Sequence, residues 1–185
     1  VFGTKNDWYY ICNIVIRDDH GTIEERNEMV NMRGRGNATW DISNSMKKPM
    51  RLKFPAKTKL LGDEFANAKN WVLLANFYDK SLIKNGLDYE LGKYMNLPFS
   101  PAAKYVDLVV NGKYMGTYQI SDKVEVGDKR IPGTKEAVWL EANSVKRTGF
   151  AEEPCFYSWD MGSALCVNIK NPEVETISKN GDAFA

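Results

Sequence analysis

The chain contains the run Arg-Gly-Arg-Gly-Asn-Ala-Thr-Trp, whose residue types and spacing could bind an anion. Gly34 and Gly36 let the backbone approach a ligand closely, because a residue without a Cβ leaves room beside the main chain. Arg35, Asn37 and Thr39 carry side-chain donors that could point at the oxygens of a phosphate. The run therefore indicates a candidate phosphate-binding loop.

A basic strand is predicted directly after this loop. The apolar residues Met50, Leu52 and Phe54 alternate with Arg51 and Lys53, which is the two-residue period of a strand. The two cations would share one face of a rigid element beside the glycine loop. A tight hairpin that carries surface arginines has the same residues, so the phosphate cradle and the hairpin remain alternative interpretations at this point.

The sequence excludes several kinds of chemistry. His20 is the only histidine, which leaves neither a Ser-His-Asp triad nor a histidine-based metal site. Cys12, Cys155 and Cys166 lack the spacing of zinc ligands, so no metal site is predicted. Whether Cys155 and Cys166 form a disulfide or stay as free thiols is open at this point.

Composition and net charge exclude further classes of protein. The 25 basic and 24 acidic residues give a net charge of +1, which argues against a general nucleic-acid-binding protein. No stretch approaches the roughly 18 consecutive apolar residues of a membrane-spanning helix. The chain starts at Val1 without a signal-peptide pattern, so we expect a mature product or an excised piece. Its 185 residues are the length of a single domain, 1–185.

The order of predicted elements indicates an α+β fold, a mostly antiparallel sheet with one long helix. Asp79 is the expected N-cap of the helix, which Asn96 and Pro98 would end. The helical stripe consists of Leu82, Ile83, Leu87, Leu91, Tyr94 and Met95. Asn111-Gly112 predicts a hairpin turn. Strands are expected over 8–17, 29–32, 49–54, 105–110, 114–120, 124–126, 138–142 and 165–169, and 71–75 is a further apolar run.

Glu90 is the acidic residue of this helix with the most interesting position. It lies between Leu87 and Leu91 on the flank of the apolar stripe, so its carboxylate could point along the edge of the core toward a strand. It could equally face solvent and pair locally with Lys93. Both interpretations stay open.

Three blocks in this order make the chain resemble a known family. The blocks are Arg33–Trp40 with Lys47–Phe54, then Trp71–Ser81, then Val106–Tyr118. The chain resembles the CotH family, the proteins similar to spore coat protein H, whose fold is a divergent relative of protein kinases. The resemblance extends from about Met29 to Pro172. It implies that the sheet and helix correspond to the amino-terminal lobe of a kinase-like fold.

The resemblance implies a nucleotide site in a protein that phosphorylates serine residues of a protein partner. The glycine loop would lie near the phosphates, Lys53 would contact them, and Glu90 would orient Lys53 as in the kinase Lys–Glu ion pair. Arg35 or Arg51 could bind phosphate instead. The expected nucleotide-binding residues are Gly34, Arg35, Gly36, Asn37, Thr39, Arg51, Lys53 and Glu90.

One departure from the family pattern limits what the chain can do. Family members carry their catalytic and metal-binding aspartates further along, whereas the likeness here ends near Pro172. The segment Trp159-Asp160-Met161-Gly162 imitates the Asp-Phe-Gly metal motif, but we interpret it as a hairpin turn. No catalytic residue is identified. We therefore expect the amino-terminal part of a larger kinase-like domain, inactive alone, with ATP and Mg²⁺ as cofactors of the full-length protein.

The resemblance also implies partners and a location. The partners would be a protein substrate and the missing carboxy-terminal half of the domain, with a homo-oligomer left open. The location would be the bacterial cell surface, the secreted fraction or the spore coat. The alternative function is a non-catalytic binding or structural module of the cell envelope or spore coat, for which the many aromatic residues would suit protein or glycan recognition.

Overall fold

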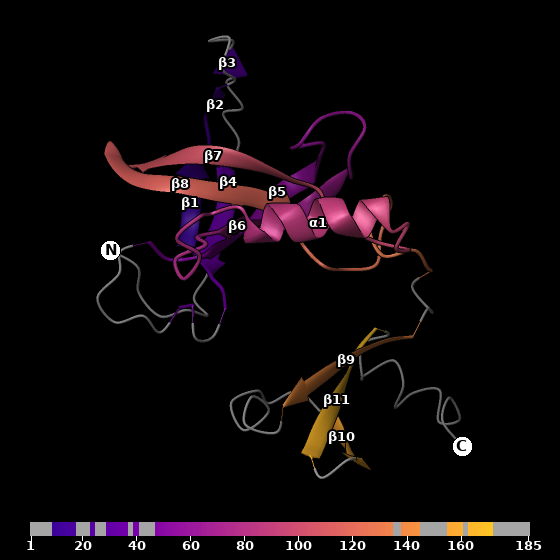
Figure 1. Cartoon of the computed structure of the whole chain (residues 1–185). Helices are drawn as coiled ribbons and strands as arrows, with labels where there is room; N and C mark the ends of the chain where they lie inside the picture. The colour runs from indigo at the N-terminus through magenta and orange to yellow at the C-terminus, as the bar shows by residue number, and fades with distance from the viewer. Residues whose placement is uncertain are drawn as a thin grey trace. The chain divides into compact units, whose positions relative to one another are not determined.

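The computed structural model describes residues 9–17, 23–24, 29–36, 39–40, 47–134, 138–144, 155–160 and 163–171. The chain forms two compact units, Val1–Pro132 and Gly133–Ala185, and each is described by itself (Figure 1). The expectation that residues 1–185 belong to one larger domain stays a prediction.

The first unit is built on a six-stranded antiparallel sheet in the order β1-β4-β5-β6-β8-β7. The strands are β1 (Tyr9–Asn13), β4 (Met29–Gly34), β5 (Met50–Thr58), β6 (Ala68–Leu74), β7 (Ala103–Val110) and β8 (Lys113–Asp122). Two strands of two residues each, β2 (Ile16–Arg17) and β3 (Ile23–Glu24), pair with each other and lie between β1 and β4 in the sequence. The helix α1 (Lys84–Tyr94) lies between β6 and β7 in the sequence. The predicted α+β fold with a mostly antiparallel sheet is confirmed.

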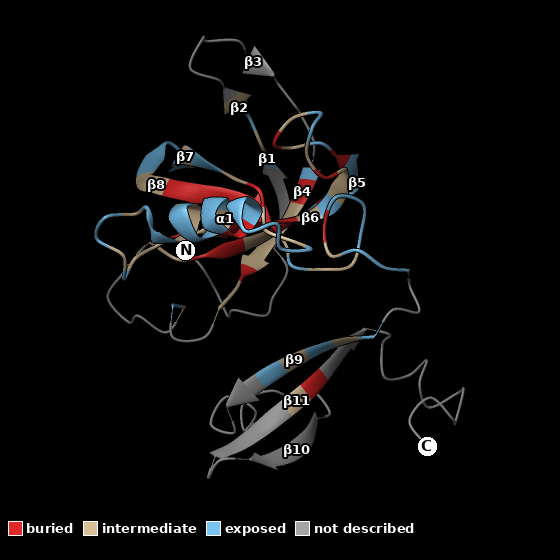
Figure 2. Cartoon of the chain, turned by 45° about the vertical axis from the view of Figure 1, so that its right-hand side comes forward, coloured by how far each residue is buried: buried red, intermediate tan, exposed pale blue. Residues whose placement is uncertain are grey.

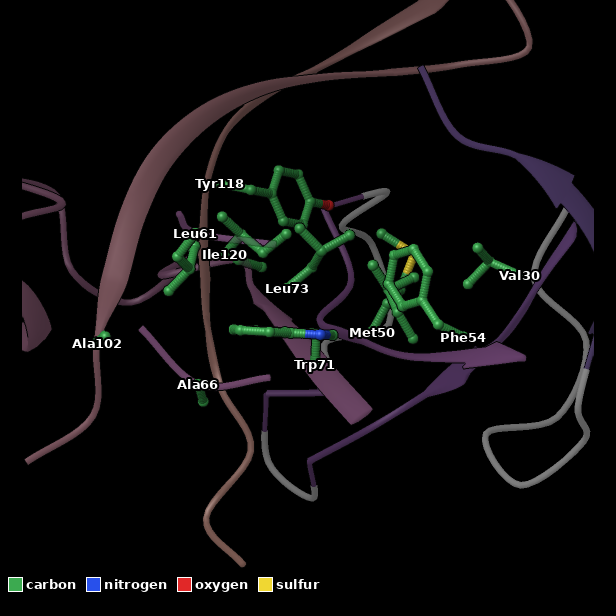
Figure 3. Packing of buried hydrophobic residues seen from close by; sticks show 12 residues of the cluster. Val30, Met50, Phe54, Leu61, Ala66, Trp71, Leu73, Ala102, Tyr118 and Ile120 are labelled. Carbon is green, nitrogen blue, oxygen red and sulfur yellow. The ribbon is translucent and has the colours of Figure 1, made fainter. Parts of the chain in front are cut away.

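One face of this sheet carries the apolar core. Met50, Leu52 and Phe54 of β5 are buried, as the predicted alternation requires, and Trp71 of β6 is fully buried among them. Figure 3 shows Trp71 with Tyr118, Leu73 and Ile120, whose side chains come from β6 and β8. Every directly paired residue in an antiparallel sheet points to the same side as its partner, so the core fixes which residues face the other way.

The helix α1 presents its apolar residues to solvent. Its half-buried or buried positions are small or polar: Asn85, Gly86, Tyr89 and Gly92. Large exposed apolar residues lie on the helix and just beyond its two ends: Ile83, Leu87, Leu91, Tyr94, Met95 and Leu97. Figure 2 accordingly shows most of α1 in the colour of exposed residues. The stripe that the sequence predicts therefore exists, but it does not face the sheet.

The predicted start of the helix is wrong. α1 begins at Lys84, because Leu82 adopts a positive φ of 64° and so interrupts any helix that starts earlier. Asp79 is not the N-cap residue. Its carboxylate nevertheless accepts hydrogen bonds from the backbone N–H of Ser81 at 3.0 Å and of Lys84 at 2.9 Å. The Ser81 hydroxyl also donates to it, and these bonds lower the pKa of Asp79.

The long hairpin of β7 and β8 is confirmed. Asn111 and Gly112 both have positive φ, as the type I′ turn requires. The strand predicted over 124–126 is wrong, since only Val126 forms an isolated bridge, with Ile131. The charged side chains in and around this segment form ion pairs with one another, and these pairs keep the segment in a loop.

The second unit contains a three-stranded antiparallel sheet in the order β10-β11-β9. Its strands are β9 (Trp139–Ser144), β10 (Cys155–Asp160) and β11 (Ser163–Asn171). β10 was not predicted, and Asp160 pairs with Ser163 across a hairpin whose connecting residues 161–162 lie outside the described ranges. The register places Cys155 opposite Asn168 and Cys166 opposite Tyr157, so the two cysteines are not direct cross-strand partners.

Candidate functional site

A patch of basic and amide side chains lies on β4, β5 and β6, on the face of the sheet opposite the apolar core. Arg33 of β4 pairs directly with Arg51 of β5, and Arg51 pairs with Val72 of β6. One step along the strands, Asn31 pairs with Lys53 and Lys53 pairs with Asn70. The cationic face is defined here as Asn31, Arg33, Arg51, Lys53 and Asn70. The predicted sharing of one face by Arg51 and Lys53 is confirmed.

Arg51 is a half-buried cation of this face with other arginines nearby. Burial lowers the pKa of its guanidinium, and the charges of Arg33 and Arg35 lower it further, whereas Glu125 raises it. Like charges placed opposite each other on neighbouring strands are destabilising. Arg51 therefore lies within electrostatic reach of two further guanidinium groups, which favours an anion that would compensate their charge.

The glycine loop begins where β4 ends. The Arg35 backbone N–H donates to the Pro49 carbonyl at 3.2 Å, and Gly36 has a φ of +86° that favours glycine. A Cβ on Gly36 would overlap the hydroxyl of Thr39, whose residue is exposed. Asn37 lies outside the described residues. The roles of this loop and of the whole predicted set at a nucleotide remain predictions.

Gly34 has a packing reason to be glycine. A Cβ at this position would overlap the indole ring of Trp40, which lies against the strand. Gly34→Ala must therefore displace a large rigid ring, and we expect it to lower the free energy of unfolding by about 1–3 kcal/mol. Thermal or urea denaturation followed by tryptophan fluorescence measures this change.

Gly127→Ala is the matched control for Gly34→Ala, because a Cβ on Gly127 would meet nothing within 4 Å. We expect it to leave the stability unchanged or slightly raised. Equal melting temperatures for Gly34→Ala and Gly127→Ala would contradict the packing role of Gly34.

Glu90 lies on the helix, at the rim of a shallow depression of about 360 Å³. The depression is lined by residues of α1, β7 and β8, among them Gly86, Tyr89, Tyr105 and Gln119. The carboxylate of Glu90 is exposed and forms an ion pair with Lys93 at 2.6 Å. The local pairing is thus the one observed, and the ion pair of Glu90 with Lys53 that the resemblance implies is not formed in this structure.

Tyr89 connects α1 to the cationic side of the sheet. Ser121 pairs directly with Val72 and therefore points to the same side as Arg51. Burial raises the pKa of the Tyr89 hydroxyl, while its hydrogen bond with Ser121 and the nearby charge of Arg35 lower it. The helix consequently brings a phenol within electrostatic reach of Arg35, at a position that the sequence did not single out.

A network of buried charges lies at the end of β8. The side chain of Arg130 is 1% exposed, stacks over the ring of Trp71 at 4.8 Å and donates to Asp122 at 2.8 Å. It also pairs with Glu125, which in turn pairs with Lys123 at 2.6 Å. Burial lowers the pKa of Lys123, and Glu125 opposes that shift. The network holds residues 123–131 against the sheet and explains why 124–126 is not a strand.

The network reaches the cationic face through one amide. Asn70 donates from Nδ2 to Glu125 at 3.3 Å and accepts at Oδ1 from Arg51 at 2.9 Å. Sequence reasoning missed Asn70, Glu125 and Arg130, since no short motif joins residues so far apart in the chain. It also left out Arg33, although this residue belongs to the Arg-Gly-Arg-Gly run and its two-residue spacing from Arg35 was a usable signal.

In the part of the chain that the structure describes, no group of three or more His, Cys, Asp or Glu residues is arranged to hold a metal ion. No helix there has the length and apolar character needed to cross a membrane.

The sequence matches the family model described as CotH kinase protein over residues 30–149. The match includes the glycine loop, the cationic face, α1 and the network around Arg130. The chain therefore belongs to the CotH kinase family. No curated protein and no solved structure matches it.

Proposed function

We propose that the first unit is the nucleotide-binding part of a CotH-family protein kinase, and that its cationic face binds the phosphates. The observation that supports this proposal is the direct pairing of Arg33 with Arg51 across β4 and β5, with Arg35 close enough to act on Arg51 electrostatically. Guanidinium groups bind phosphate through charge-assisted, often bidentate hydrogen bonds. A polyphosphate across this face would offset the like charges and accept hydrogen bonds from the guanidinium groups.

The proposed cofactors are ATP and Mg²⁺ in the full-length protein. The donors of the described residues fit the phosphates: Arg33, Arg35 and Arg51, with Lys53 at the exposed end of the same face. Bound ATP would supply the phosphoryl group, and Mg²⁺ would neutralise part of the charge of its phosphates. The carboxylates of Asp122 and Glu125 are already bound by Arg130 and Lys123. They are therefore poor candidates for Mg²⁺ ligands.

We include Glu90 in the proposed site, because a shift of α1 would bring its carboxylate closer to the cationic face. Its ion pair with Lys93 is exposed, and exposed pairs of this kind contribute little to stability. The pair therefore opposes a rearrangement only weakly. Tyr89, one residue earlier and already within electrostatic reach of Arg35, is the additional helix residue that we assign to the phosphate side.

Calorimetric titration with ATP tests this proposal. We expect the chain to bind ATP weakly, and the double variant Arg51→Gln, Lys53→Gln to bind it at least tenfold more weakly, since charge-assisted hydrogen bonds contribute about 1.5–3 kcal/mol each. Lys113→Gln is the control, because Lys113 is an exposed cation at the turn of β7 and β8, eight residues along β8 from Ser121. Equal binding by wild type and the double variant, or no binding by wild type, would overturn the proposal.

The proposed partners follow from the family and from the surface of α1. We propose a protein substrate whose serine residues are phosphorylated, at the bacterial surface or in the spore coat. The exposed stripe Ile83, Leu87 and Leu91 supports an additional protein contact, either with the remaining part of the kinase-like domain or with a second copy. The same stripe supports the alternative function, a non-catalytic binding or structural module. ATP binding that depends on Arg51 distinguishes the first function from the second.

A further inference from the structure

We propose that Asn70 and Glu125 are positioning residues that fix the guanidinium of Arg51 toward the cationic face. The inference rests on the proposed binding of phosphate at that face. It assigns to two residues outside the glycine loop a role in that binding.

The inference depends on the orientation of the Asn70 side-chain amide. Its Oδ1 accepts from Nη2 of Arg51 at 2.9 Å, while its Nδ2 donates to Oε2 of Glu125 at 3.3 Å. A carboxylate only accepts hydrogen bonds, so it selects the orientation in which the amide nitrogen faces Glu125. In that orientation the amide oxygen must face Arg51. Glu125 therefore sets the polarity of the contact that holds Arg51.

Glu125 is itself held in place by Arg130 and Lys123. Its other oxygen pairs with Nη1 of Arg130, and Lys123 binds the oxygen that also faces Asn70. Arg130 is fixed in turn by Asp122 and by a bond of 2.8 Å from Nη2 to the backbone carbonyl of Asn70. The series from Arg130 through Glu125 and Asn70 to Arg51 thus starts at a side chain with almost no freedom to move.

Arg51 needs such support because of its neighbours. Arg33 lies directly across β4 and β5, and the charges of Arg33 and Arg35 both act on Arg51. In the absence of an anion, repulsion would turn a freely rotating guanidinium away from the others. A guanidinium already held in place loses less conformational entropy when phosphate binds.

Two measurements on the whole chain test the inference. Arginine-selective ¹⁵N NMR reports the rotation of the Arg51 guanidinium, whose signals are assigned by their loss in Arg51→Gln. We expect resolved Nη protons in wild type and averaged signals in Asn70→Leu and in Glu125→Gln. We also expect the affinity for inorganic tripolyphosphate to fall about tenfold in both variants, the size of effect typical of residues that orient a binding group.

Glu64→Gln is the control, since Glu64 is an exposed acid elsewhere on the first unit, and it should change neither measurement. In an Arg51→Gln background, Asn70→Leu should cause no further loss of affinity, because Asn70 would act only through Arg51. Resolved Arg51 signals in both variants, or an additional loss in that background, would overturn the inference. If wild-type protein binds neither ATP nor tripolyphosphate, the proposed function fails, while the NMR comparison still decides whether Asn70 and Glu125 orient Arg51.

Discussion

Asp122→Ala is expected to lower the free energy of unfolding by about 3–5 kcal/mol, the cost of removing one partner of a buried ion pair. The Asp122 carboxylate is buried, accepts from Nε of Arg130 at 2.8 Å and accepts from the backbone N–H of Ala102 at 3.0 Å. Without it, the guanidinium of Arg130 stays buried with Glu125 as its one remaining acidic partner. The backbone N–H of Ala102, one residue before β7, loses its acceptor as well, so β7 is held less firmly against β8.

Urea denaturation followed by tryptophan fluorescence measures this loss, because the indole of Trp71 lies against Arg130. Asp128→Ala is the control: Asp128 lies in the loop that carries Arg130, is exposed and should change the free energy of unfolding by no more than about 0.5 kcal/mol. A midpoint for Asp122→Ala equal to that of Asp128→Ala would show that the network of Arg130 does not stabilise the fold.

The second large effect concerns association. Leu87 is 64% exposed and Leu91 is 51% exposed on the outward side of α1, next to Ile83 and Met95. Apolar side chains gathered in this way favour burial against another molecule. We expect the isolated chain to self-associate, and Leu87→Lys with Leu91→Lys to weaken that association at least tenfold. The melting temperature of the double variant should stay close to that of the wild type, since both side chains are already in water.

Sedimentation analysis over a range of protein concentrations measures the association. Val109→Lys is the control, because Val109 is an equally exposed apolar residue on β7, away from the stripe. It should leave the association constant unchanged. A wild-type chain that stays monomeric at all concentrations would contradict the expectation and would remove the support that the stripe gives to a protein contact.

Much of the fold could be predicted because its signals are local. The alternation on β5 fixed the face of Arg51 and Lys53, and Asn111-Gly112 fixed the hairpin of β7 and β8. The orientation of α1 could not be predicted in this way. Periodicity tells which residues share a side of a helix, but contacts with the sheet decide which side is buried, and here Gly86 permits a close approach to Tyr105.

The candidate site could be predicted only where it lies within one short segment. The shared face of Arg51 and Lys53 follows from the alternation of one strand, and the roles of Arg35, Arg51 and Lys53 at a nucleotide stay predictions. Asn70 and Glu125 are joined across 55 positions of the chain, and only the register of β6 and β8 brings them together. The predicted strand at 124–126 failed for a related reason, since its β propensity was outweighed by the ion pairs of Glu125 with Arg130 and Lys123.

The order of the strands has a consequence for the synthesis of this protein. β6 pairs with β8 and not with β7, the strand that follows it along the chain, and Trp71 is paired with Asp122, the last residue of β8. One edge of β6 therefore stays without its partner on the ribosome until the entire β7–β8 hairpin has emerged. A nascent chain that stalls before that point exposes an apolar strand edge, which is a template for aggregation.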